Sequence, residues 1–191
     1  MFESSVKDSS QTVSTSEKAA RNTTAGRSIR LVEPDRRTQY NIHTVNQNNL
    51  ILLPNELGNL TFLTTSKIIS DYSRLASLPN KLENLISLVI FNINYCSSLA
   101  ILSNELKNLT SLNTFEINQC SRLISLPNKL NSLTFLTTLK IIECSSLTSL
   151  LYELGNLISL TTFNISGCLS LMSLPYELGN LISLIISYIS C

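Results

Sequence analysis

Apolar residues recur at a fixed spacing of 24 residues over the second half of the chain. One row of cysteines and two rows of leucines keep this spacing: Cys96, Cys120, Cys144 and Cys168; Leu75, Leu99, Leu123, Leu147 and Leu171; and Leu78, Leu102, Leu126, Leu150 and Leu174. A register kept over four periods predicts a repeat architecture in which each 24-residue segment is one structural unit.

Each unit has two halves with different apolar spacing. In the unit that begins at Leu126, the residues Leu139, Lys140 and Ile141 alternate apolar and polar, which predicts a strand with one buried face. The other half, Leu126-Pro127 followed by leucines at every third position, predicts a tight helical turn that begins near the proline. One strand and one return arc cannot bury these leucines alone, so the copies are expected to stack.

The full pattern, L-x-x-L-x-L-x-x-C-x-x-L-x-x-L-P-x-x-L-x-x-L, resembles the leucine-rich repeat over about residues 45–191. The cysteine-containing form is most similar to the repeat region of plant disease-resistance receptors of the TIR/NBS type. The phrase LPxELGNL at 53–60 and 174–181 also resembles plant intracellular Ras-group repeat proteins. The resemblance implies an α/β solenoid, with a parallel sheet on the concave face and short helical or 3₁₀ arcs on the convex face.

The composition changes along the chain and predicts two regions. Residues 1–40 contain Ser, Thr, Lys and Arg but a single leucine, Leu31, and we expect a disordered tail. Residues 41–191 are expected to form about six repeats, of which the last is truncated and lacks a polar cap. That end predicts a longer array, self-association or poor solubility. In one arc, Leu151 replaces the proline.

Charge and hydropathy exclude several classes of function. The net charge is +1 and no basic stripe is present, so no nucleic-acid partner is expected. No segment is long and apolar enough for a membrane span, and the first residues lack the apolar core of a secretory signal. We therefore expect a protein of the cytosol, with the nucleus equally compatible.

The cysteine row raises the alternatives of a metal site and of disulfides. Short C-x-x-C spacings, which metal clusters prefer, are absent, and equivalent side chains of parallel strands point the same way rather than at each other. We expect a structural column of buried thiols: Cys96, Cys120, Cys144 and Cys168. The single histidine, His43, has no fixed partner in the pattern, so we expect no enzyme activity, metal or cofactor.

The resemblance implies that a protein partner binds the outward residues of the strands. Gln119, Ile142 and Glu143 are among these outward positions, and the candidate binding residues are Lys67, Asn92, Asn94, Tyr95, Glu116, Asn118, Lys140 and Asn164. The leading hypothesis is an intracellular protein-recognition module, with a role in defence as its narrower form. Three alternatives stay open: an ordinary solvated sheet face, a fragment of a larger repeat protein with no activity of its own, and a scaffold subunit of a signalling complex.

Overall fold

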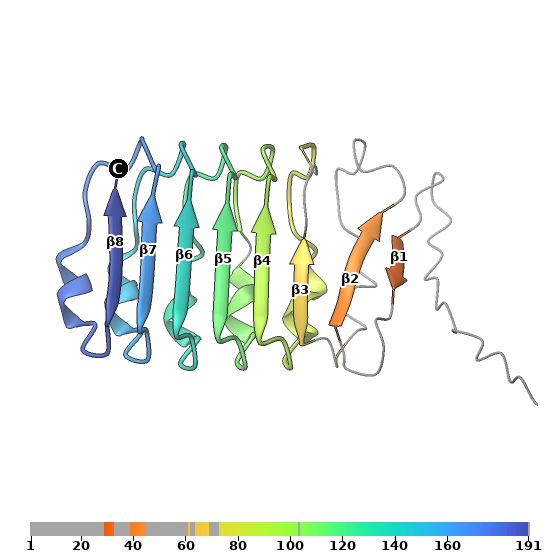
Figure 1. Ribbon diagram of the computed structural model, residues 1–191, viewed down its shortest axis with the longest axis horizontal. Helices are drawn as coiled ribbons and strands as arrows, with labels where there is room; N and C mark the ends of the chain where they lie inside the picture. Colours follow the sequence, from red (N-terminus) through yellow and green to blue (C-terminus); the bar gives the residue numbers. More distant parts are fainter. Residues whose placement is uncertain are drawn as a thin grey trace, which may run out of the picture.

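A computed structural model describes residues 29–32, 39–44, 61, 64–68, 73–102 and 104–190. Within these ranges, the strands form a single sheet of eight strands in sequence order (Figure 1). The strands are β1 (Ile29–Val32), β2 (Gln39–Thr44), β3 (Thr65–Ile68), β4 (Ile90–Asn94), β5 (Thr114–Asn118), β6 (Thr138–Ile142), β7 (Thr162–Ser166) and β8 (Ile186–Ser190). From β2 to β8 all neighbours are parallel, as a stack of equivalent units requires.

Short 3₁₀ segments form a second layer behind the strands (Figure 1). They are η3 (Asn80–Asn84), η4 (Asn104–Asn108), η5 (Leu130–Ser132), η6 (Tyr152–Asn156) and η7 (Tyr176–Asn180). Pro79 and Pro175 precede two of them in extended conformation, with φ of −71° and −66°. Leu151 takes the same place before η6 with φ −79° and ψ 139°, so the missing proline leaves the backbone unchanged.

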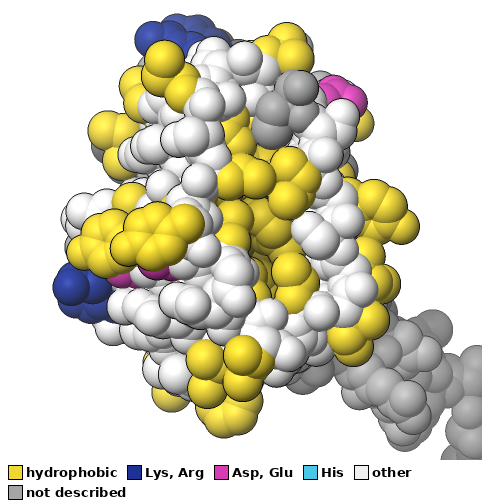
Figure 2. Space-filling model, turned by 90° about the vertical axis from the view of Figure 1, so that its left-hand side faces the viewer, with side chains coloured by type: hydrophobic (Ala, Val, Ile, Leu, Met, Phe, Trp, Pro, Cys, Tyr) yellow, Lys and Arg dark blue, Asp and Glu magenta, His cyan; other side chains and the backbone are white. Residues whose placement is uncertain are grey.

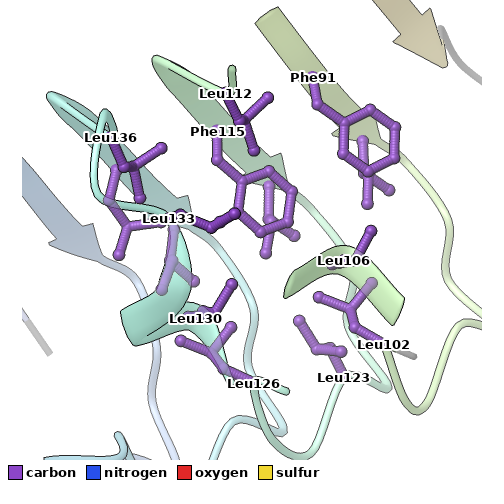
Figure 3. Close-up of a cluster of buried hydrophobic side chains, with 14 of the residues drawn as sticks. Phe91, Leu102, Leu106, Leu112, Phe115, Leu123, Leu126, Leu130, Leu133 and Leu136 are labelled. Carbon is purple, nitrogen blue, oxygen red and sulfur yellow. The ribbon is translucent and has the colours of Figure 1, made fainter. Parts of the chain in front are cut away.

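The core lies between the two layers and continues from one repeat to the next. In β5, β6 and β7 buried residues alternate with partly exposed ones, and the inward residues meet the leucines of the arcs (Figure 3). Burial of one such side chain contributes about 1.5–3 kcal/mol, but only when a neighbouring repeat covers it. The sheet and its arcs are therefore stable as a stack rather than as single repeats.

Backbone hydrogen bonds join each repeat to the next just before the strand. The carbonyl of Val89 accepts bonds from the amides of Asn113 and Thr114, at 2.9 and 3.0 Å. The carbonyls of Asn113 and Thr137 accept the equivalent bonds in the two repeats that follow. These bonds set the register of β4–β8, so side chains at equivalent positions form rows across the sheet.

The N-terminal region differs from the expectation of a disordered tail over residues 1–40. Ile29–Val32 forms β1, which pairs antiparallel with β2, and β2 begins at Gln39. The expectation rested on the average composition of the whole segment, whereas β1 lies on a short stretch, Ile29–Val32, that is richer in apolar residues; most of β2 lies in the region expected to form the solenoid. Residues 1–28 and 33–38 lie outside the described ranges, as do the first arc phrase at 53–60 and Cys191.

Candidate interaction surface

The side chains of β4–β8 that point away from the core, together with the residue after each strand, form the strand face. Because the register advances by whole repeats, these side chains form rows across it, and three of the rows build the candidate site. The central row is Asn92, Glu116, Lys140, Asn164 and Tyr188, and Lys67 on β3 is in register with Asn92. The amide row is Asn94, Asn118, Ile142 and Ser166, and the edge row is Tyr95, Gln119, Glu143 and Gly167.

The central row holds one ion pair. Lys140 Nζ lies 2.8 Å from Glu116 Oε1 on the neighbouring strand, and both side chains are partly exposed. Such a pair stabilises a fold by about 0–1 kcal/mol, so its main effect here is to fix the position of the Glu116 carboxylate. On either side of the pair, the Oδ1 atoms of Asn92 and Asn164 are buried without a donor among the described residues.

The amide row begins with a hydrogen bond between two asparagines. Asn118 Nδ2 donates to Asn94 Oδ1 at 2.7 Å, and Asn94 is almost fully buried. The next position of the row is Ile142, which has no polar group, and Asn118 Oδ1 is left buried without a donor within the described ranges. The row therefore ends in an unsatisfied acceptor beside the ion pair.

The edge row turns the chain out of each strand. Tyr95, Gln119 and Glu143 have φ of 56°, 53° and 54°, and Gly167 has φ 65°. This left-handed conformation costs about 1–2 kcal/mol for a residue other than glycine, so the fold holds the backbone of these three residues in a conformation that is locally unfavourable. The turn lets each amide donate to the next strand, as Tyr95 N–H does to the Asn118 carbonyl at 2.9 Å.

The three rows enclose a shallow hollow of about 450 Å³ across the carboxyl ends of β4, β5 and β6. Its lining residues are Asn92, Asn94, Tyr95, Glu116, Asn118, Gln119, Ile142 and Glu143. Gln119 Nε2 donates to Glu143 Oε2 at 2.6 Å across the edge row. The hollow thus carries two carboxylates, three asparagine amides and one tyrosine ring.

Five of the eight candidate binding residues from the sequence line this hollow, and Lys140 reaches it through Glu116. Lys67 and Asn164 continue the central row beyond it. Gln119, Ile142 and Glu143 also line it, although the sequence analysis placed them only among outward positions. Their place in the repeat indicates this location: Gln119 and Glu143 lie one and two repeats after Tyr95, and Ile142 lies one repeat after Asn118.

Behind the edge row, the four cysteines of the repeat are fully buried where each strand turns toward its arc. The thiols donate to carbonyls two residues before them, as Cys96 Sγ does to Asn94 at 3.5 Å. The pKa of Cys120 is raised to about 12: contact with Cys144 lowers it, but contact with Cys96 and burial outweigh this. Contact with Cys120, then burial, raises the pKa of Cys144 further. Both thiols are therefore protonated and unreactive at neutral pH.

A second surface lies at the β8 end of the stack. There the leucine and isoleucine positions that are buried in earlier repeats are partly or largely exposed: Leu171, Leu174, Leu178, Leu184 and Ile189. Ile189, for example, is 49% exposed, whereas Ile165 on β7 is fully buried. Figure 2 shows hydrophobic side chains as a band in the middle of this end face.

Neither surface has the composition of a metal centre. No group of three or more His, Cys, Asp or Glu side chains that could hold a metal ion occurs among the described residues. None of the helical segments in the described ranges is long and apolar enough to cross a membrane.

Comparison with known proteins gives likeness of fold alone. No family model and no curated protein matches the sequence. Among solved structures, a leucine-rich-repeat protein of Leptospira interrogans, LIC12759, is 21% identical over 75% of this chain and 53% of its own, with a TM-score of 0.40. The leucine-rich-repeat domain of the type III effector XopL is 16% identical over 74% of this chain and 73% of its own, with a TM-score of 0.37.

The present chain spans about half the length of the Leptospira protein. At these identities and scores, nothing about function passes from these proteins to the chain. The fold itself follows from the 24-residue register, the parallel sheet and the 3₁₀ arcs. It is a leucine-rich-repeat solenoid.

Proposed function

We propose that the chain is a protein-recognition module and that its partner binds on the strand face, at and around the hollow. The observation that carries this proposal is the set of buried amide oxygens of Asn92, Asn118 and Asn164, which have no hydrogen-bond donor among the described residues. A buried acceptor without a donor costs about 1–3 kcal/mol, so a partner that supplies N–H groups recovers that energy when the amide side chains rotate toward it. On an ordinary solvated face, such acceptors would be exposed and would bind water.

The rigidity of the platform supports the same proposal. The strands hold Asn92, Glu116 and Lys140 at equivalent positions of adjacent parallel strands. The ion pair restricts the rotamers of Glu116 and Lys140, and the amide hydrogen bond restricts those of Asn94 and Asn118. Preorganised polar groups lose little conformational entropy on binding. Tyr95, 48% exposed at the rim, adds a large rigid side chain of the kind that anchors interfaces.

The test places a photo-crosslinking amino acid at Tyr95 in the full chain, and at Tyr176 on the arc side as a control. A partner that binds the strand face should crosslink from Tyr95 and not from Tyr176. The double substitution Tyr95→Ala with Glu116→Ala should abolish its binding, whereas Tyr176→Ala with Glu177→Ala removes the same residue types and should not. Equal crosslinking from both faces, or a double variant that binds as the wild type does, would remove the strand face from consideration.

An intracellular location and a role in plant defence are the narrower form of this proposal. Both rest on the resemblance of the cysteine-containing repeat to resistance receptors. Localisation of the tagged chain in plant cells, together with loss of a defence response when the strand face is altered, tests this form. A chain found outside the cell would contradict it.

Self-association through the β8 end face is a second proposal, carried by a different observation. The face is apolar, and Glu177 is the only residue from Leu169 through Ser190 that is charged at neutral pH, so two copies can meet with little charge repulsion. The outer edge of β8 also offers backbone groups that a second β8 can pair. Light scattering should find dimers of the wild type and monomers of Ile189→Lys, with Ile158→Lys on the arc side as control. A monomeric wild type would refute this.

A further inference from the structure

The hollow on the strand face carries an excess of negative charge. Glu116 lies on its central-row side and Glu143 on its edge-row side, so two carboxylates flank it. Among the described residues of β4–β8 and the residue after each strand, Lys140 is the only cation, and it is paired with Glu116. Gln119, which donates to Glu143, is neutral. The formal charge around the hollow is therefore −1, which favours a cationic group.

Several of the unused hydrogen-bonding groups around the hollow are acceptors. Lys140 occupies one oxygen of Glu116, and Gln119 occupies one oxygen of Glu143, which leaves the second oxygen of each without a described partner. The Oδ1 atoms of Asn92 and Asn118 also lack donors among the described residues, but both are buried, and a ligand reaches them only after the amide side chains rotate. A ligand that fits this set must bring several N–H groups in different directions.

The tyrosine at the rim adds a further requirement. Tyr95 lies in a turn with φ of 56°, and its backbone N–H donates a hydrogen bond to β5. The backbone from which the ring projects is therefore held in place. An aromatic face beside carboxylates attracts a flat cation by cation–π contact and stacking.

We infer that the hollow binds the guanidinium group of an arginine that a segment of the partner protein presents. A guanidinium offers five N–H donors in one plane, matches carboxylate oxygens on two sides and stacks on a tyrosine ring. An ammonium group of lysine has three donors at one point and cannot reach both carboxylates and the amide oxygens together. The inference deepens the proposed function and rests on it, since the arginine belongs to the protein that binds the strand face.

The test uses small probes on the full chain, so that it does not depend on finding the partner. Nα-acetyl-arginine methylamide is titrated into isotope-labelled protein, and the backbone and side-chain amide signals are followed. The citrulline analogue has the same shape but no charge, and the lysine analogue has the charge without the plane. We expect saturable shifts at Gln119, Glu143 and the asparagine amides with Kd in the millimolar range. Citrulline and lysine should bind about tenfold more weakly or worse.

A conservative variant links the probe to the hollow. Glu143→Gln keeps an oxygen that can accept the Gln119 bond but removes the charge, and it should weaken arginine binding about tenfold. Glu177→Gln makes the same change on η7, away from the hollow, and should leave the affinity unchanged. Added salt should weaken the arginine complex because the attraction is between charges.

Three outcomes would overturn the inference: equal binding of citrulline or lysine, shifts that lie away from the hollow, or no saturable binding of the arginine probe. If the arginine probe fails while crosslinks from Tyr95 persist, the arginine inference fails and the proposed function stands. If the crosslinks also fail, the proposed function fails with it.

Discussion

The rings of Phe91 and Phe115 stack in the core with their centroids 5.5 Å apart and their planes inclined by 2°. They occupy equivalent positions on β4 and β5, and Leu139 and Phe163 occupy the next two positions of the same row. Parallel strands lie about 4.8 Å apart, so equal side chains in equal rotamers are forced into contact over their flat faces. The stack therefore joins two repeats through the centre of the core (Figure 3).

Phe115→Ala should lower the free energy of unfolding by about 3–5 kcal/mol, because the fully buried ring leaves a cavity and Phe91 loses its stacking partner. Urea unfolding followed by circular dichroism measures the change. Phe135→Ala removes the same side chain from an exposed position and should change stability by less than about 0.5 kcal/mol. Equal losses in the two variants would contradict the buried stack.

Two glycines at equivalent places, Gly155 and Gly179, should respond differently to alanine. A Cβ on Gly155 would overlap the carbonyl oxygen of Glu177 on the next arc, whereas a Cβ on Gly179 would meet nothing within 4 Å. Gly155→Ala should destabilise the chain by about 1–3 kcal/mol through overpacking. Gly179→Ala should leave stability within about 0.5 kcal/mol.

Thermal unfolding of these two variants and the wild type gives the comparison. A large loss with Gly179→Ala would mean that another chain or segment packs on η7. A neutral Gly155→Ala would mean that η6 and η7 do not approach as closely as the structure has them.

The repeated part of the fold could be predicted from the sequence, because each repeat has the same spacing of apolar residues. The 24-residue register, the strand around Leu139 and the arc after Pro127 follow from local spacing, and the structure confirms the solenoid. The sheet's addition of β1 could not be predicted, because its antiparallel pairing with β2 depends on two segments outside the repeat. A pattern that is periodic says nothing about a segment that breaks the period.

The hollow shows a second limit. Alternation places Tyr95, Gln119 and Glu143 at equivalent outward positions, but it does not say that their φ is positive or that they bound a concavity. Gly167, the glycine at the same place in a later repeat, was the one residue that pointed to this conformation. The depth of a surface depends on the relative positions of neighbouring turns, and the spacing of residues in the sequence does not give those positions.

The amide row should be extendable by one residue. Asn118 Oδ1 lacks a donor because Ile142 follows it in the row, and an asparagine there could donate as Asn118 does to Asn94. A double-mutant cycle between Ile142→Asn and Asn118→Ala should give a favourable coupling of about 1 kcal/mol, the typical net value of one hydrogen bond. Urea midpoints of the four proteins measure it, and a coupling of zero would mean that the Asn118 amide turns its oxygen elsewhere.

The cysteine row should make stability fall at alkaline pH. The pKa of Cys120 is raised from 9.0 to about 12 in the folded chain, and that of Cys144 is raised further. Above pH 9 the unfolded chain therefore binds fewer protons than the folded one. Each thiol's contribution to the free energy of unfolding is complete below pH 9 and is lost as the pH rises toward the pKa of the folded state. The loss is about 1 kcal/mol per thiol between pH 9 and 10.

Because tyrosines and lysines also titrate there, the measurement is the difference between wild type and Cys120→Ala with Cys144→Ala in urea midpoints at pH 8, 9 and 10. The double variant should be less stable at pH 8 yet lose less stability with rising pH, with Ser145→Ala behaving as the wild type. Parallel pH profiles for all three proteins would show that the two thiols ionise as easily in the folded chain as in the unfolded one.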